Sequence, residues 1–329
     1  MAPQLRILMM GTGRFAVPTF EALLNSRHTV VGLITQPDRV ARGRRKHVNP
    51  MKQLAEQHDV PVFPPPNVNE PEAVEQVKAF DAELSVVAAY GQILSADVIE
   101  APRLGSINLH ASLLPKYRGA APIQHAILNG ETETGITIFQ IEPRLDAGPL
   151  LGVVRTEIGD DETYGELEER LMLLGPPLAM KVVDQLAAGT TEPLVQDKSA
   201  VTKARSLKKG FGEIDWTKSM HEVHCHIRGT QPWPRPFSFL HRPEHPTARL
   251  LILKAQPKDG ILEEGLEPGA ARVEAGKLWI ACSDGWLPIL IVQPEGKRAM
   301  EVDVFLRGNA ISQDARFGPE DSGSNQTTE

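Results

Sequence analysis

The segment Leu5-Arg6-Ile7-Leu8-Met9-Met10-Gly11-Thr12-Gly13 decides the fold of this chain. Its apolar run predicts a buried strand over residues 5–10, and the glycines after it predict a turn into a helix over residues 15–25. A second apolar run predicts another strand over residues 29–35. A strand, a helix and a strand in this order predict a parallel sheet with a right-handed crossover between the strands.

The same alternation continues up to residue 189. Further strands are predicted over residues 60–63, 84–89, 106–110, 135–142 and 150–156, and further helices over residues 70–80, 123–128 and 162–188. The sequence therefore predicts the α/β class, with an open, doubly wound, Rossmann-like and mostly parallel sheet. We expect this sheet to form a catalytic domain over residues 1–189.

The pattern changes after residue 189. Residues 190–210 are mixed and polar, which predicts a linker. A helix over residues 219–228 precedes short strands separated by glycines and prolines, and together they predict a smaller, OB-like β-barrel domain over residues 211–317. Residues 318–329 combine Ser, Gly, Asn, Thr and acidic residues, so we expect a disordered tail.

Composition is that of an ordinary globular protein. The chain has 329 residues, 41% of them hydrophobic and 23% charged, and its formal net charge of -7 argues against a protein that coats nucleic acid. Cys225 and Cys282 are too few for a disulfide framework, so a reducing compartment, the cytoplasm, is expected. We see neither a signal peptide nor an apolar stretch long enough for a bilayer, which predicts no membrane association.

The turn over residues 11–16, Gly-Thr-Gly-Arg-Phe-Ala, fits the glycine-rich fingerprint of dinucleotide-binding folds. That fingerprint also needs an acidic residue at the end of the second strand, which here ends in Thr35-Gln36-Pro37 before Asp38. The pattern favours a tight turn between strand and helix over a nucleotide site, so no NAD is expected.

The run His221-Glu222-Val223-His224-Cys225-His226 allows two interpretations. His221 and Cys225 lie four residues apart on the predicted helix and could share a metal ion. No second pair of ligands lies nearby in the sequence. A helix with surface histidines at the entry to the second domain is the better interpretation, and no metal is expected.

A cluster of basic residues follows the second predicted strand and comprises Arg39, Arg42, Arg44, Arg45 and Lys46. The loop that carries them leaves the carboxyl end of a strand, where α/β sheets bind their ligands. Charge alone leaves two interpretations open: a solvated loop, or an arm that binds the phosphates of a nucleic acid.

Asn108 and His110 are the strongest candidates for a site. They lie two residues apart at the end of a predicted strand, so their side chains point to the same face. Asp146 lies in a loop after another predicted strand. An amide can stabilise an oxyanion, an imidazole can move a proton, and a carboxylate can orient the imidazole.

The same set lacks a nucleophile. Ser112 follows His110 closely, but the sequence around it is not that of a nucleophile elbow. The residues therefore predict direct attack by a substrate nucleophile on a carbonyl, without a covalent enzyme intermediate. The alternative is that Asn108 and His110 are simply satisfied polar residues at a strand end.

Longer motifs around these residues resemble those of the folate-dependent formyltransferase family. They are Asn-Leu-His-Ala-Ser-Leu-Leu-Pro over residues 108–115, Tyr-Arg-Gly-Ala-Ala-Pro-Ile-Gln over residues 117–124 and Leu-Asp-Ala-Gly-Pro over residues 145–149. The similarity covers nearly the whole chain and is strongest with the members that act on initiator tRNA. Two departures are Gly13, where we expect proline, and a basic loop that is slightly shorter and richer in arginine.

The resemblance implies transfer of the formyl group of the co-substrate 10-formyltetrahydrofolate to the α-amino group of methionine on initiator tRNA. It implies that Asn108, His110 and Asp146 are the catalytic trio, and that the basic loop contacts the tRNA, with Arg42 the best single candidate. The residues that it places against folate are Ser112, Leu113, Leu114, Pro115, Val87, Tyr90 and Gly91. A monomer is expected.

Three rival functions remain open from the sequence. One is formyl transfer to a small amine, such as a nucleotide sugar or a purine precursor, or hydrolysis of the formyl-folate. Another is a nicotinamide-dependent dehydrogenase, suggested by the glycine-rich turn. The last is a non-catalytic RNA-binding module that uses the barrel. The basic loop and the barrel argue against a small substrate, and the Asn-His-Asp set argues against a module that only binds.

Overall fold

The computed structural model describes residues 3–38 and 49–320. The chain forms two compact units. The first unit comprises Met1–Ile123, Glu133–Glu157 and Glu166–Ser206, and the second comprises Gln124–Thr132, Ile158–Gly165 and Leu207–Glu329. Each unit has its own hydrophobic core.

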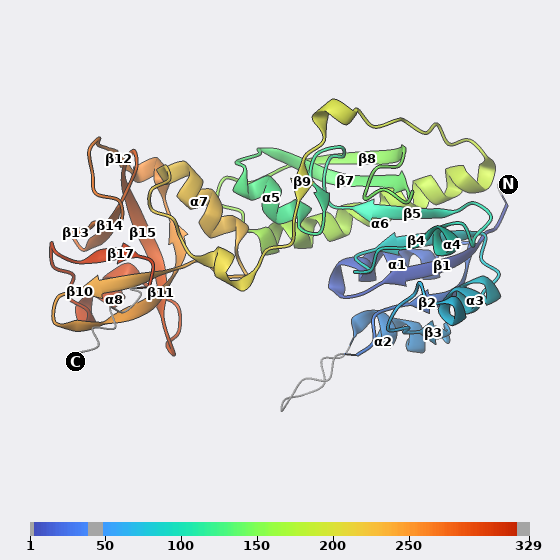
Figure 1. Ribbon diagram of the computed structural model, residues 1–329, viewed down its shortest axis with the longest axis horizontal. Coiled ribbons are helices and arrows are strands. Elements are labelled where there is room, and N and C mark those ends of the chain that lie inside the picture. The colour runs from blue at the N-terminus through green and yellow to red at the C-terminus, as the bar shows by residue number, and fades with distance from the viewer. Residues whose placement is uncertain (1–2, 39–48, 321–329) are drawn as a thin grey trace, which may run out of the picture. The chain divides into compact units, whose positions relative to one another are not determined.

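The first unit is built on a seven-stranded sheet with the strand order β3-β2-β1-β4-β5-β7-β8. Its strands are β1 (Arg6–Gly11), β2 (Thr29–Ile34), β3 (Val62–Phe63), β4 (Leu84–Ala88), β5 (Ser106–His110), β7 (Glu133–Gln140) and β8 (Leu150–Glu157) (Figure 1). β1 to β5 run parallel, whereas β7 is antiparallel to β5 and β8. The order reverses between β1 and β4, and such a reversal is where open α/β sheets bind ligands.

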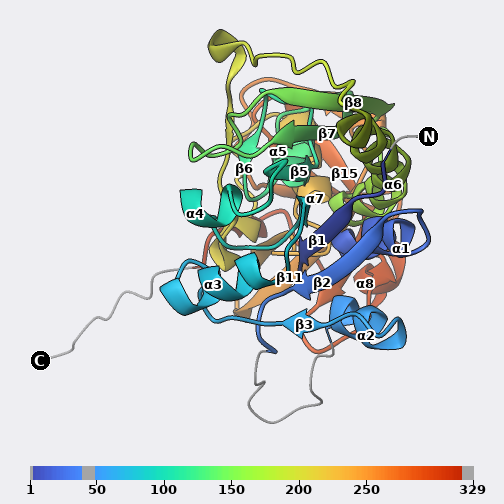
Figure 2. The ribbon, with the colours of Figure 1, turned by 90° about the vertical axis from the view of Figure 1, so that its right-hand side faces the viewer.

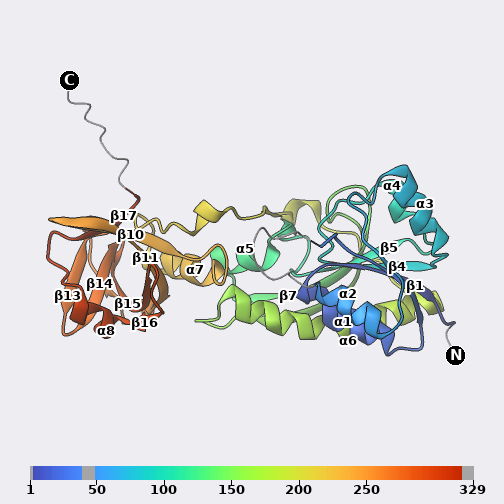
Figure 3. The same ribbon diagram turned by 90° about the horizontal axis from the view of Figure 1, so that it is seen from below.

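Helices cover both faces of this sheet. α1 (Val17–Leu24) and α6 (Tyr164–Ala188) lie over one face, and α3 (Pro71–Ala79) and α4 (Ala96–Ile99) lie over the other (Figures 2 and 3). The other helices in this part of the sequence are η1 (Arg14–Ala16), α2 (Pro50–Gln57) and α5 (Pro122–Leu128). The strand interiors are apolar on both faces, as burial between two helical layers requires.

α6 is the one helix among the described residues that could cross a membrane by its length and composition, although the sequence predicted no such stretch. This is weak evidence, because the core helices of globular proteins pass the same test. Leu171, Ala179 and Val183 of α6 are buried, and its Asp184 pairs with Arg27 of the same unit. These contacts are those of a helix that packs within the first unit.

The second unit is a near-closed antiparallel barrel with the strand order β13-β14-β15-β11-β10-β17. Its strands are β10 (Phe237–Arg242), β11 (His245–Ala255), β12 (Ile261–Leu262), β13 (Ala271–Glu274), β14 (Lys277–Cys282), β15 (Gly285–Pro294), β16 (Met300–Glu301) and β17 (Arg316–Gly318). A bridge between Ala270 and Arg316 joins the two ends of this order. The fold class that the sequence predicts, a mostly parallel α/β sheet followed by a β-barrel, is confirmed.

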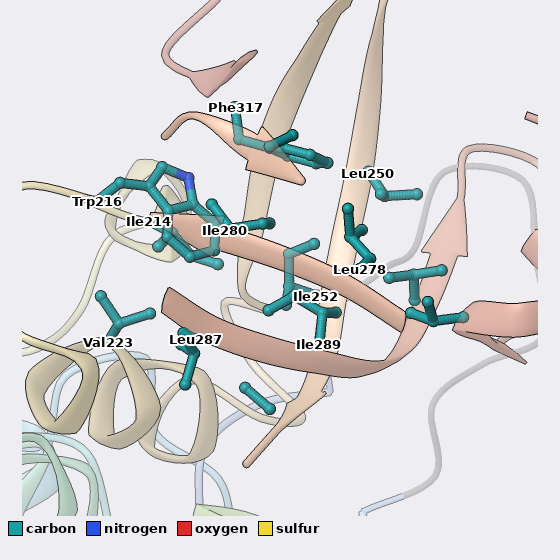
Figure 4. Close-up of a cluster of buried hydrophobic side chains, with 14 of the residues drawn as sticks. Ile214, Trp216, Val223, Leu250, Ile252, Leu278, Ile280, Leu287, Ile289 and Phe317 are labelled. Carbon is teal, nitrogen blue, oxygen red and sulfur yellow. The ribbon is translucent and has the colours of Figure 1, made fainter. Parts of the chain in front are cut away.

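The barrel core is filled by aliphatic side chains from every major strand. Ile252, Leu278, Ile280 and Leu287 are fully buried and point toward one another (Figure 4). α7 (Met220–Gly229) adds apolar residues to the same core, and α8 (Val302–Gly308) also packs on it. α7 begins in a capping box formed by Ser219 and Glu222, which satisfies its first backbone N–H groups.

Two expectations differ from the observed fold. Most of the segment predicted as a linker belongs to the first unit, because β9 (Lys203–Ala204) pairs with β6 (Arg118–Gly119) there. The sequence analysis also did not predict α2. Asn49 is the N-cap of this helix, and Pro50 is in its first turn. Of the predicted tail, residue 318 ends β17 and residues 321–329 lie outside the described residues.

Candidate active site

Asn108 and His110 lie on β5, the strand that separates the parallel and antiparallel parts of the sheet. Asn108 is paired in register with Val87 of β4 on one side and with Phe139 of β7 on the other. Its side chain is half-buried and makes no hydrogen bond to another described residue. The amide of Asn108 can therefore donate to an incoming oxygen without first breaking a hydrogen bond to any described residue.

His110 is buried, and both of its ring nitrogens face protein acceptors. Nε2 lies 2.8 Å from the backbone carbonyl oxygen of Tyr117. Because a carbonyl can only accept, Nε2 carries a proton in the neutral ring. Nδ1 lies 3.8 Å from Oδ2 of Asp146, within ion-pair range once the ring is protonated. Any proton that His110 gains or loses is therefore carried on Nδ1, on the side of the carboxylate.

Asp146 is fixed in a loop between β7 and β8. Its backbone is left-handed, with φ of 47°, which is uncommon for a residue other than glycine. Its Oδ2 accepts a hydrogen bond of 2.7 Å from the backbone N–H of Gly119. The structure thus places the His110 ring beside the Asp146 carboxylate, and Asn108 lies two residues before His110 on β5.

The residues expected to contact folate after β5 form a loop held by hydrogen bonds. The Ser112 hydroxyl donates to the carbonyl of Lys116, and the Ser112 carbonyl accepts from the hydroxyl of Thr137. The Leu114 N–H donates to the same hydroxyl, and the Leu114–Pro115 peptide bond is cis. Ser112 and Leu114 are buried, so only Leu113 and Pro115 expose side-chain surface from this set.

The residues expected to contact folate at the end of β4 and just after it would present main-chain atoms to a ligand rather than side chains. Val87 and Tyr90 are buried in the core of the first unit, and burial raises the pKa of Tyr90 to about 12. Ala89 and Gly91 both have positive φ, which turns the chain sharply around Tyr90. A ligand at this bend would meet main-chain atoms, with Gly91 exposed to it.

The basic cluster, Arg39, Arg42, Arg44, Arg45 and Lys46, lies outside the described residues. The residues on either side of it are held at the carboxyl edge of the sheet. Gln36 donates through Nε2 to the Tyr90 carbonyl, and Asn49 donates through Nδ2 to the Thr35 hydroxyl at 2.7 Å. Gln36 and Asn49, described residues on either side of the cluster in the sequence, are therefore both tied to this edge of the sheet.

The glycine-rich turn is stabilised within the protein. The Thr12 hydroxyl accepts from the backbone N–H of Gln36 and lies 3.3 Å from the Thr35 hydroxyl. Gly13 has φ of 77°, which proline cannot adopt. Glycine at position 13 therefore allows a backbone conformation in this turn that the expected proline could not adopt.

The expected helix with surface histidines is present as α7, and His221 is exposed on it, but His224 is buried and His226 is half-buried. His224 is buried against Asp161, and burial, with the charge of Arg228, lowers the pKa of His224 to about 4. The ring is therefore neutral near pH 7, and the contact with Asp161 is a hydrogen bond between a neutral ring and a carboxylate. Among residues 3–38 and 49–320, no group of three or more His, Cys, Asp or Glu side chains could hold a metal ion.

Sequence reasoning missed the backbone groups that hold His110 and Asp146. The Tyr117 carbonyl and the Gly119 N–H lie two residues apart and bind the two sides of the His110–Asp146 pair. Thr202 holds this stretch in turn, since its hydroxyl accepts from the Tyr117 N–H. Main-chain groups carry no sequence signal, and Thr202 lay in the predicted linker.

The chain belongs to the formyl transferase family. The family model described as formyl transferase matches residues 5–183, and the model of the formyl transferase C-terminal domain matches residues 206–310. The match to both models confirms the family that the motifs suggested.

Within that family, the chain is similar over nearly its whole length to proteins named methionyl-tRNA formyltransferase. The protein from Methylococcus capsulatus is 43% identical over 309 residues, which cover 94% of this chain and 98% of that protein. The protein from Stutzerimonas stutzeri is 45% identical over 299 residues, which cover 90% of this chain and 93% of that protein.

Solved structures share the fold at low sequence identity. The N-formyltransferase from Helicobacter canadensis, in complex with folinic acid and dTDP-3-aminofucose, matches with a TM-score of 0.65 and 18% identity. The match covers 88% of this chain and 100% of that one. WlaRD, a sugar 3N-formyl transferase in the presence of dTDP and 5-N-formyl-THF, matches with a TM-score of 0.63 and 17% identity, over 90% of this chain and 100% of that one.

Proposed function

We propose that this protein transfers the formyl group of 10-formyltetrahydrofolate to the α-amino group of methionine on initiator tRNA, and so acts in translation initiation. Its family and its whole-length similarity to methionyl-tRNA formyltransferases support this function. A single observation carries the chemistry: a half-buried amide without a hydrogen-bond partner among the described residues shares a strand with an imidazole that faces a carboxylate 3.8 Å away.

The proposed reaction starts with attack of the neutral amine on the formyl carbon. A C–N bond forms, the carbonyl oxygen becomes an oxyanion, and the Asn108 amide donates to it. The bond from the formyl carbon to N10 of the folate then breaks. The proton that the amine loses passes by way of Asp146 and Nδ1 of His110 and ends on N10 of the leaving tetrahydrofolate.

The test of this function is a comparison of formyl acceptors. The purified protein is incubated with 10-formyltetrahydrofolate and methionyl initiator tRNA, with methionyl elongator tRNA and an amino-sugar nucleotide as alternatives. We expect rapid formylation of the initiator tRNA and slow reaction with the other two. Preference for the amino sugar would assign the protein to small-amine formylation. Binding of tRNA without turnover would assign it to the RNA-binding modules.

We propose that the basic cluster binds the phosphates of the tRNA, with Arg42 and Arg44 as test residues. Replacing both by alanine is expected to weaken tRNA binding and to reduce the slope of log K against log salt by about one for each lost phosphate contact. Folate affinity should not change. Arg103→Ala, which removes an exposed arginine paired with Glu83, is the control. An equal loss of folate binding would contradict a dedicated arm.

We also propose that the protein is a monomer in the cytoplasm, where its tRNA substrate is found. Sedimentation equilibrium over a range of concentrations would measure the molecular mass. A single species near the 36.1 kDa of the chain is expected.

A further inference from the structure

Gln196 holds the loop that carries Asp146. It lies in the segment that the sequence predicted as a linker, and its side chain is buried. Its Nε2 donates to two backbone carbonyls of the loop, 2.9 Å to that of Asp146 and 2.7 Å to that of Gly148. Its Oε1 accepts from Nε and Nη2 of Arg118, at 3.2 and 2.7 Å. Both ends of this amide are therefore used, one on the loop and one on Arg118.

Together with one further hydrogen bond, these contacts hold both the backbone and the carboxylate of Asp146. Arg118 directly precedes Gly119, whose N–H binds Oδ2 of Asp146. The backbone of Asp146 is thus tied to Arg118 through Gln196, while its side chain is tied to the next residue along the same stretch. That stretch also binds Nε2 of His110, through the Tyr117 carbonyl. His110 and Asp146 are therefore held against one short segment, residues 117–119.

Asp146 needs such support because of its backbone. A positive φ is uncommon for a residue other than glycine, and such a conformation persists when the surrounding structure fixes it. The hydrogen bond from Gln196 fixes the Asp146 carbonyl, and the bond to Gly148 fixes the loop two residues later. Without them, rotation of the Asp146 backbone would carry the carboxylate away from Nδ1 of His110.

We propose that Gln196 is a positioning residue for formyl transfer, which acts by keeping the Asp146 carboxylate on the Nδ1 side of the His110 ring. This inference rests on the proposed function of the Asn108, His110 and Asp146 set. It predicts an effect on the chemical step rather than on folate binding, because the hydrogen bonds of Gln196 go to Arg118 and the loop of Asp146 and to none of the described residues expected to bind folate.

Two substitutions separate the contacts of Gln196. Gln196→Met removes all of its hydrogen bonds at similar volume, whereas Gln196→Glu keeps the acceptor for Arg118 and removes the donor to the carbonyls. The measurements are the single-turnover formylation rate at saturating substrates, the KM for 10-formyltetrahydrofolate and the midpoint of thermal unfolding. Both variants are expected to lower the single-turnover rate by about 10- to 100-fold, with the KM nearly unchanged.

Ser106→Ala is the matched control. Ser106 is a buried residue at the start of β5, the strand that ends at His110. Its hydroxyl donates to the backbone carbonyl of Ile99. Its loss should lower the unfolding midpoint but leave the formylation rate unchanged, since the site is not touched.

The outcomes distinguish the inference from the function on which it rests. A full rate in both Gln196 variants, while Asn108→Ala is slow, would overturn the positioning role alone. A full rate in Gln196→Glu with loss in Gln196→Met would also overturn it, because the contact with Arg118 would then be the one that matters. A full rate in Asn108→Ala would show that the proposed trio itself is wrong.

Discussion

Asn108→Ala is expected to lower the turnover number by about 10²–10³-fold, the usual effect of removing one oxyanion donor. The Asn108 side chain is half-buried and makes no hydrogen bond to another described residue, so its removal leaves none of the described groups without a partner. The KM for the folate should change little, because the interaction forms as the carbonyl becomes tetrahedral. Steady-state kinetics with methionyl initiator tRNA measure both quantities.

A second asparagine offers the control for this substitution. Asn25 lies at the end of α1, and its side chain donates to the Glu21 carbonyl at the surface. Asn25→Ala should leave turnover unchanged. Full turnover in Asn108→Ala would exclude the oxyanion role.

Asp146→Asn is expected to lower the turnover number by about 10²–10⁴-fold, the range over which general acid–base groups contribute. The amide oxygen of the variant can still accept from the Gly119 N–H, so the loop should keep its conformation. What disappears is the negative charge 3.8 Å from Nδ1 of His110, which stabilises the protonated ring. Turnover and unfolding are measured on the same preparation.

The chain contains a matched histidine–carboxylate pair outside the proposed site. Nε2 of His28 lies 3.2 Å from Oδ1 of Asp184, and the His28 side chain is fully buried. Asp184→Asn should lower stability without lowering turnover. If both variants lost activity to the same extent, the effect of Asp146→Asn would be one of stability.

Much of the fold follows from local sequence patterns. The apolar runs that begin at residues 5, 29, 84 and 106 are strands in the structure because a strand buried between two helical layers needs apolar residues on both faces. Val17-Pro18 is compatible with α1 because the helix starts at Val17, where proline in the first turn loses no hydrogen bond.

The sequence predicted the side chains of the candidate site but not the groups that hold them in place. Asn108 and His110 were grouped because they lie two residues apart on a strand, and Asp146 was added as a carboxylate in the loop after another predicted strand. The groups that hold them are main-chain atoms of Tyr117 and Gly119 and a glutamine from a segment read as a linker. No periodicity marks such contacts, since they join residues distant in sequence.

The sequence by itself determined the class of the fold and the side chains proposed for the site, because apolar periodicity and side-chain type are local properties of the chain. Only the tertiary structure decided which nitrogen of His110 faces Asp146, and that His224 is buried and neutral rather than exposed. Tautomer, burial and pKa depend on neighbours brought together by folding. Residues 117, 146 and 196 become one site only when the sheet, the loop and the returning segment pack together.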